Sequence, residues 1–245
     1  MSKTNLVDLL QWDTQFFGFA VAQIYGSQIN KFAIKEIFEF CDSNKVKLLQ
    51  FKCDNHDRAS VLLAEQNRFH FADSRMNYSL KINRGQFQLP DSVIDYSFRL
   101  GEKRDIPILE DIAQDLYLDS RYHFDKNFPQ DRVRLFYSNW IKKAVLGTFD
   151  DLAWVITKHD HPVGFCSIVF REPNIAQIGL VGLHPLETGK GLGKYLMANV
   201  LHSLEKSDVK QVDVGTQGRN YSAQRLYQRV GFTIDNIETY YHKWF

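Results

Sequence analysis

The chain has 245 residues, of which 44% are hydrophobic and 24% charged, so it can bury a core without disulfide or metal support. Its 30 basic and 29 acidic residues leave a formal net charge of +1, which speaks against a broad nucleic-acid-binding surface. Cys41, Cys53 and Cys166 are too few for a disulfide framework, and the odd count suits a reducing compartment. No set of His, Cys and acidic residues has metal-ligand spacing, so we expect no metal.

The first ten residues lack the apolar segment of a signal peptide, and no apolar run approaches the ~18 residues that a membrane span needs. We therefore expect a cytoplasmic protein with neither membrane insertion nor nucleic-acid binding. Turn-forming residues cluster between 83 and 97, in Asn83-Arg84-Gly85-Gln86 and Leu89-Pro90-Asp91-Ser92. They predict a boundary between an N-terminal domain over 1–85 and a larger domain over 97–245.

The elements of the larger part follow in chain order. Residues 96–100 read as a strand, and Asp105 with Pro107 starts a helix. Residues 120–129 read as an aromatic, charged loop, after which Asp131 caps a second helix. Three strands over 153–157, 164–170 and 175–183 are joined by short turns and predict an antiparallel meander. A helix over 191–206, a strand over 209–216, a helix over 222–230 and a strand from Phe232 complete the chain.

Three glycines at alternate positions, Gly189, Gly191 and Gly193, lie between an apolar strand and an amphipathic helix. Glycines let the backbone approach a ligand closely, and the free N–H groups of a helix N-terminus bind anions. Lys190 and Lys194 add positive charge, so the segment predicts a site for phosphate or pyrophosphate.

Three other interpretations of the glycines compete with this one. A glycine-rich turn without a ligand is the plainest, because Gly-x-Gly-x-Gly alone is a weak pattern. A dinucleotide-binding fold would need Gly-x-Gly-x-x-Gly inside a βαβ unit, whereas this strand closes an antiparallel meander. A P-loop would need Gly-Lys-Ser/Thr, which is absent.

Two motifs resemble those of the GNAT N-acetyltransferases. Thr188-Gly189-Lys190-Gly191-Leu192-Gly193 occupies the place of the family's Arg/Gln-x-x-Gly-x-Gly/Ala, with Thr188 where the family has Arg or Gln. Asn220-Tyr221-Ser222-Ala223-Gln224-Arg225-Leu226-Tyr227-Gln228-Arg229-Val230-Gly231-Phe232 resembles its second signature. The resemblance, which spans about 97–245, implies an α/β (α+β) GNAT fold. This fold has a mixed central sheet flanked by helices, here preceded by a smaller, partial GNAT-like domain.

The resemblance implies acetyl-CoA as the cosubstrate and assigns roles by position. Val181 and Leu183 would hold the pantetheine arm through their backbone, and Asn220 would contact the same arm. The pyrophosphate would lie on Gly189, Lys190, Gly191, Leu192, Gly193 and Lys194.

Tyr227 takes the family's place for a general acid. A phenol with a pKa near 10 stays protonated at neutral pH and can give its proton to a departing thiolate. The competing interpretation is a core tyrosine on an amphipathic helix. The general base stays open between Asp213, Glu187 and water, since both carboxylates read as ordinary exposed groups.

The N-terminal part repeats the end of the chain at an offset of 163 residues, which places Phe69 on Phe232. Residues 47–80 then read as strand, helix and strand, like 210–243, but Ala64 replaces Tyr227 and no glycine loop precedes the segment. We interpret this part as a degenerate half of the same fold without a cofactor site. Chance similarity is the alternative.

A closer resemblance, to acetyltransferases of dTDP-linked amino sugars in surface-polysaccharide synthesis, runs through nearly the whole chain. It is carried by residues 10–18, by Ser120-Arg121-Tyr122-His123-Phe124 and by residues 136–150. It implies a 4-amino-4,6-dideoxyhexose on a dTDP carrier as acceptor and a homodimer as the assembly. Arg121, Tyr122, His123 and Phe124 would offer a guanidinium for phosphate and rings for the sugar or base. A GNAT enzyme for peptide or other small-molecule amines and a non-catalytic acyl-CoA-binding module are the alternatives.

Overall fold

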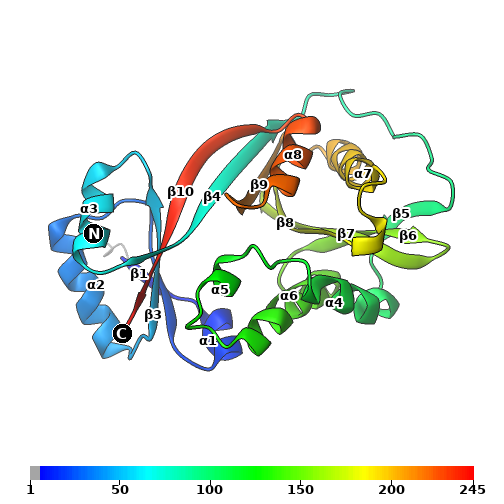
Figure 1. Cartoon of the computed structure of the whole chain (residues 1–245). Helices are drawn as coiled ribbons and strands as arrows, with labels where there is room; N and C mark the ends of the chain where they lie inside the picture. The colour runs from blue at the N-terminus through cyan, green and yellow to red at the C-terminus, as the bar shows by residue number, and fades with distance from the viewer. Residues whose placement is uncertain (1–5) are drawn as a thin grey trace.

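The computed structural model describes residues 6–245 as one mixed sheet with helices on both faces (Figure 1). The strands are β1 (Val7–Leu9), β2 (Val21–Ile24), β3 (Leu48–Asp54), β4 (His70–Lys81), β5 (Tyr96–Leu100), β6 (Leu152–Lys158), β7 (His161–Glu172), β8 (Ile175–Leu183), β9 (Gln211–Gln217) and β10 (Thr233–Trp244). The helices are α1 (Gln11–Phe17), α2 (Lys31–Ser43), α3 (Arg58–Gln66), α4 (Ile106–Gln114), α5 (Arg121–Phe124), α6 (Gln130–Val145), α7 (Leu192–Lys206) and α8 (Tyr221–Arg229), with short 3-10 turns at Lys103–Asp105 and Pro185–Glu187. The expected fold class is confirmed.

The sheet runs in the order β1-β2-β3-β10-β4-β9-β8-β7-β6-β5. Its pairs are antiparallel except β2 with β3 and β8 with β9, and both parallel pairs are joined through a helix, α2 or α7. The expected meander is confirmed as β6, β7 and β8. Within residues 6–245, no helix is both long and apolar enough to span a bilayer.

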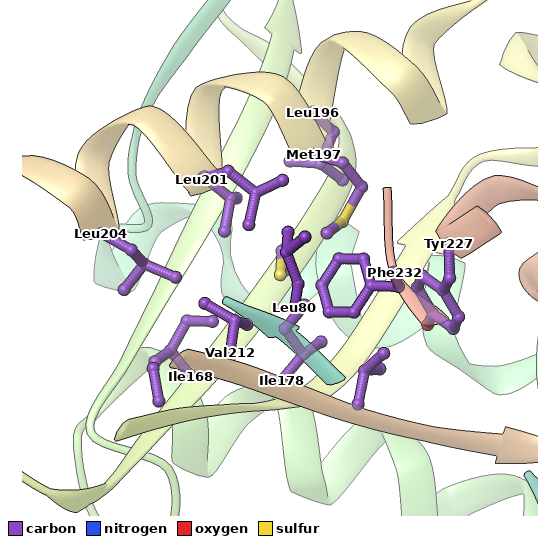
Figure 2. Close-up of a cluster of buried hydrophobic side chains, with 14 of the residues drawn as sticks. Leu80, Ile168, Ile178, Leu196, Met197, Leu201, Leu204, Val212, Tyr227 and Phe232 are labelled. Atoms are coloured by element: carbon purple, nitrogen blue, oxygen red, sulfur yellow. The ribbon is translucent and has the colours of Figure 1, made fainter. Parts of the chain in front are cut away.

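Three buried clusters hold the helices on the sheet. Leu196, Met197, Leu201 and Leu204 of α7 pack on Leu80, Ile168, Ile178 and Val212, and Figure 2 shows Phe232 and Tyr227 at one end of this cluster. Helices α2 and α3 pack on the same face of the sheet farther along, over β3. Helices α1, α4, α5 and α6 cover the opposite face with an aromatic cluster around Phe136. Burial of large rings at this density is a main source of folding free energy.

The repeat seen in the sequence reappears in the element bounds. β3, α3 and β4 begin and end 163 residues before β9, α8 and β10. The pairing follows the same rule, because Leu48 opposite Trp244 in β3–β10 corresponds to Gln211 opposite Lys81 in β9–β4. The last strand of the N-terminal half, β4, therefore pairs with β9 of the C-terminal half, and the last strand of the C-terminal half, β10, pairs with β3. β4 and β10 also pair with each other at the centre of the sheet (Figure 1).

The boundary expected between residues 85 and 97 falls in the segment that joins β4 to β5. The parts before and after it share one sheet, since β10 lies between β3 and β4. That the N-terminal part is a degenerate half-domain remains our interpretation, which rests on the matching strand registers.

Two expectations were wrong in detail. Residues 120–129 are not all loop: Ser120 caps the short helix α5 by accepting a hydrogen bond from the His123 amide. The second helix begins at Gln130 with Pro129 at its N-cap, so Asp131 lies in the first turn and does not cap. An acidic residue in the first turn still favours the helix through its dipole.

Candidate active site

A cleft opens where β8 and β9 stop pairing. Their parallel ladder ends at Ile178 opposite Val214, although both strands continue, β8 to Leu183 and β9 to Gln217. The backbone of β8 beyond Ile178 therefore has no strand partner on the β9 side. A pocket of about 570 Å³ fills this gap and reaches from the glycine loop to Arg75 and Arg121.

A β-bulge in β8 is fixed by a buried hydrogen-bond network. Gly179 and Leu180 lie opposite the single residue Ser167 of β7, whose hydroxyl accepts from the Leu180 amide at 2.8 Å. The Ser167 hydroxyl donates to Asp150, which also accepts from Nε1 of Trp140 at 2.9 Å. Burial raises the pKa of Asp150 from its ordinary value, while the two donors act in the opposite direction. By fixing the bulge, the network determines which backbone groups of β8 face the cleft.

Val181 and Leu183 lie on this free edge and line the pocket, as the pantetheine role requires. The carbonyl of Val181 accepts from the hydroxyl of Tyr117 at 3.1 Å. Tyr117 stacks on Tyr137 and was not singled out in the sequence, because an isolated tyrosine after a helix carries no motif.

The glycine loop has the backbone that an anion cradle needs. Gly189 and Gly191 adopt φ angles of +76° and +80°, which L side chains disfavour, and the space around both is open. Gly191 is the N-cap of α7, and no side chain in the described part of the chain caps this end, which leaves the first N–H groups of the helix available. Leu192 is buried under the loop, and Gly193 lines the pocket and packs near Leu226.

The two lysines of the loop differ. Lys194 is exposed, whereas the ammonium of Lys190 pairs with Glu187 at 2.8 Å. Glu187 was expected to be exposed, which is wrong: it is 8% exposed and also accepts from Tyr96 at 2.5 Å. Hydrogen bonds from Lys190 and Tyr96 lower the pKa of Glu187 to about 2. A carboxylate held in this way is a poor proton acceptor, and it does not line the pocket.

Tyr227 and Asn220 meet the pocket from α8. Tyr227 is 4% exposed, contacts the rings of Tyr78 and Phe232, and its hydroxyl has no hydrogen-bond partner among residues 6–245. Burial raises the pKa of this phenol above its ordinary value. Asn220 caps α8 through Oδ1, which accepts from the Ala223 amide at 3.0 Å, and its side-chain nitrogen Nδ2 has no hydrogen-bond partner among residues 6–245.

Arg121 also lines the pocket, and its guanidinium lies between two tyrosine rings. Its guanidinium carbon is 4.2 Å from the ring centres of both Tyr122 and Tyr240. Nη2 donates to the Tyr122 hydroxyl at 2.7 Å and to Gln50 at 3.3 Å. No carboxylate within residues 6–245 forms an ion pair with Arg121.

The other residues predicted to bind the acceptor substrate do not all lie at the pocket. Tyr122 lines the pocket, but its hydroxyl donates to Asp13 at 2.8 Å. His123 and Phe124 do not line the pocket, and Phe124 instead supports the guanidinium of Arg219 at 4.2 Å. The helix α5 thus turns two of the four side chains away. Asp213, considered as a base, accepts from Gln211 on its own strand and also lies outside the pocket.

Sequence reasoning missed several polar side chains of the pocket, namely Arg75, Tyr117, Asp119, Asp150, Arg171 and Gln177. They come from separate elements with no common spacing. One signal was present for Arg75, because an isolated glycine in a strand, Gly215, marks a close approach by another group. No group of three or more His, Cys, Asp or Glu side chains that could hold a metal occurs in the described part of the chain.

Comparisons with known proteins agree with this geometry. A model of the acetyltransferase (GNAT) family matches residues 109–232. The chain is 29% identical over 162 residues to the spore coat polysaccharide biosynthesis protein SpsD of Bacillus subtilis, over 64% of this chain and 55% of that protein. It is 27% identical over 164 residues to the dTDP-fucosamine acetyltransferase of Escherichia coli O6:H1, over 66% of this chain and 70% of that enzyme.

The chain thus spans little more than half the length of the first of these relatives. Among solved structures, a GCN5-related N-acetyltransferase from Sphaerobacter thermophilus overlays with a TM-score of 0.68 at 15% identity. This overlay covers 97% of the present chain and 76% of the other, and at this identity it shows the fold alone.

Proposed function

Because the chain belongs to the GNAT acetyltransferase family, we propose that it is an N-acetyltransferase and that its acceptor is the amino group of a dTDP-linked 4-amino-4,6-dideoxyhexose. Members of this family use acetyl-CoA. The product would enter surface-polysaccharide synthesis, and one relative is named for spore coat polysaccharide biosynthesis. The observation that carries the proposal is Arg121, whose guanidinium has no carboxylate partner among residues 6–245 and which lines the same pocket as Gly193 of the glycine loop. Such a group suits a phosphate-bearing acceptor.

The cofactor role rests on the cleft beside β8. The backbone of Val181 and Leu183 would pair with the pantetheine arm as an added strand would, because no other strand occupies that edge. The pyrophosphate would accept from N–H groups of Gly189, Lys190, Gly191, Leu192, Gly193 and Lys194 at the start of α7. The free amide nitrogen of Asn220 would donate to the same arm.

Tyr227 would act as the general acid of a direct transfer. The acceptor amine attacks the thioester carbonyl, the carbon–sulfur bond breaks, and the departing thiolate takes the phenolic proton. Burial keeps that proton on Tyr227 at neutral pH. Of the three bases that the sequence leaves open, Glu187 and Asp213 do not line the pocket, so water would take the proton of the amine.

The pocket also bears on the alternatives. A peptide-acetylating enzyme would present an open, acidic or apolar groove, whereas three arginines line this pocket. For the assembly and location, we propose a cytoplasmic homodimer, as in the closer resemblance. Light scattering on the purified protein would test the dimer.

The substrate is tested by acetyl-CoA consumption with a panel of amines. We expect acetylation of dTDP-4-amino-4,6-dideoxyhexoses, with weaker activity on UDP-linked amino sugars and none on peptide amines. Activity on peptide amines alone would refute the proposal. The position of the acetyl group on the product, read by NMR, would identify the attacked carbon.

A further inference from the structure

The pocket contains a second arginine that none of the sequence motifs includes. On β4, Met76 packs into the cluster under α7, so its neighbour Arg75 points to the opposite face of the sheet. On β9, Val214 packs into the same cluster and Gly215 faces the other side. Arg75 and Gly215 therefore share the face that carries the outer part of the pocket, and both line it.

Arg75 is held in place from one side only. Its Nε donates to Oδ1 of Asn77 at 2.8 Å, and Asn77 in turn donates to Glu238 at 2.8 Å and to Asn236 at 2.6 Å. The two terminal nitrogens have no hydrogen-bond acceptor among residues 6–245. The guanidinium is thus oriented by its inner nitrogen while its outer fork stays free.

The fork lies directly over Gly215. A Cβ at position 215 would overlap Nη2 and the guanidinium carbon of Arg75 and would lie 2.8 Å from Nε. The glycine is therefore required for the arginine to lie flat on the strand. A glycine inside a strand weakens it, so its presence here fits a need for space above the backbone.

A third arginine faces the same pocket from β7. Nε of Arg171 donates to Gln177 at 2.7 Å, and among the described residues Arg171 and Arg75, like Arg121, form no ion pair with a carboxylate. Burial would raise the pKa of the Tyr240 phenol, but the charges of Arg121 and then Arg75 hold it below its ordinary value. The positive charges of both arginines therefore act on the same phenol.

The acidic groups nearby leave a positive excess. Of the two carboxylates that line the pocket, Asp150 is occupied by Trp140 and Ser167, and Asp119 is exposed. Asp73, which also lies near Arg121 and Arg75, pairs with Arg219 at 3.5 Å, and its pKa is raised to about 6, chiefly by burial. Guanidinium groups that lie near one another without carboxylate partners repel each other, and a bound anion would offset that repulsion.

We propose that Arg75 and Arg171 bind the diphosphate of the nucleotide-linked acceptor, with Arg75 positioned by Asn77 and by the open space over Gly215. The planar fork of arginine matches phosphate oxygens in pairs. This inference rests on the proposed function, and it makes the diphosphate a condition for tight acceptor binding. A free amino sugar would reach the same acetyl donor but would lack this anchor.

The experiment compares Arg75→Gln, Arg171→Gln and Gly215→Ala with Arg84→Gln, a control in the exposed segment between β4 and β5. With the nucleotide-linked amino sugar, each pocket variant should raise the acceptor KM by about tenfold or more, as expected for lost charge-assisted hydrogen bonds. The KM for acetyl-CoA should stay unchanged. With the methyl glycoside of the same sugar, wild type and variants should have equal KM values. Arg75→Lys, which keeps the charge but loses the fork, should fall between wild type and Arg75→Gln.

A second measurement separates this inference from the proposed function. Inorganic pyrophosphate is titrated by calorimetry into protein saturated with CoA, so that the glycine loop is already occupied. Binding by wild type and Arg84→Gln, lost in Arg75→Gln, would support the anion subsite even if no amino sugar in the panel is acetylated. Absence of binding to wild type, or equal binding to Arg75→Gln, would overturn it. Equal acceptor KM values for wild type and Arg75→Gln with the nucleotide-linked sugar would overturn it as well.

Discussion

Tyr227 is buried, lines the pocket and has a hydroxyl without a hydrogen-bond partner among residues 6–245. Tyr227→Phe removes only the hydroxyl, so acetyl-CoA affinity should be unchanged, while kcat should fall by about 100-fold or more if the phenol gives its proton in the transition state. Because burial raises the pKa of Tyr227, the phenol should still hold its proton at pH 9.5. Steady-state kinetics over pH 6–9.5 with isothermal binding of acetyl-CoA checks both statements.

Tyr78→Phe is the matched control for this prediction. Tyr78 is a buried tyrosine whose ring lies 5.9 Å from that of Tyr227, but it does not line the pocket. Its substitution should leave kcat near the wild-type value. A wild-type kcat in Tyr227→Phe would exclude the general-acid role.

At the scale of single residues, the candidates that the sequence singled out belong to continuous motifs, and their roles stay predictions. Tyr227 and Asn220 follow a spacing along a single helix, and the structure places both at the pocket. Arg75, Asp150 and Arg171 come together only because β4, the turn between α6 and β6, and β7 all border the pocket, and no local sequence pattern encodes that arrangement. His123 and Phe124 were grouped with Arg121 because they are adjacent in sequence, yet adjacent residues of a helix point in different directions.

Among the elements, the loop before α7 carries the sharpest test. Gly191→Val places a β-branched side chain at a φ of +80°, where the surrounding space is open but the backbone conformation is disfavoured. The side chain would also stand in the path of an anion approaching the helix N-terminus. We expect acetyl-CoA affinity to fall roughly tenfold or more, since several backbone hydrogen bonds to the pyrophosphate are lost together.

Gly26→Val supplies the control. Gly26 has the same φ of +80° and equally open surroundings, but it lies in the turn between β2 and α2. Both variants should lose a similar amount of stability, about 1–3 kcal/mol for the strained backbone, measured by urea unfolding. Equal acetyl-CoA affinity in the two variants would argue against the cradle.

The elements themselves were largely predictable, because α7, β9, α8 and the β6–β8 meander have clear periodicity and turn residues. Two helices were not predicted correctly, one because it is short and the other because its N-terminus lacks the expected side-chain cap. Helix α5 has four residues, too few to show a period, and α6 begins after Pro129 without a side-chain cap. The bulge in β8 was also missed, since it depends on Ser167 and Asp150 from outside the strand.

At the scale of the molecule, the exchange of β4 and β10 makes each half complete the other. Tyr78, Leu80 and Ile82 belong to the core under α7, and Tyr241 belongs to the core under α2 and α3. We expect residues 97–245 expressed alone to be insoluble or to lack a cooperative thermal transition. In that fragment β10 would lose both neighbouring strands, β9 would lose β4, and α7 would lose part of its core.

Co-expression of residues 1–85 with residues 97–245 tests whether the two fragments complement each other. The two fragments should associate and recover acetyl-CoA binding, which pull-down and calorimetry would show. If residues 97–245 alone unfold cooperatively and bind acetyl-CoA, then the interleaved sheet is not needed for the fold. The sequence predicted the repeat at its offset of 163, but not the exchange, because strand pairing between segments so far apart leaves no local trace.

The position of β10 near the end of the chain also determines when the sheet can be completed during synthesis on the ribosome. β3 and β4 both need β10 as a neighbour, and roughly 150 residues separate the end of β4 from the start of β10. At ~5–20 residues per second, the two strands keep an open edge for on the order of ten seconds. Nascent chains are exposed to aggregation during that interval, and the final strand closes both halves in one late step.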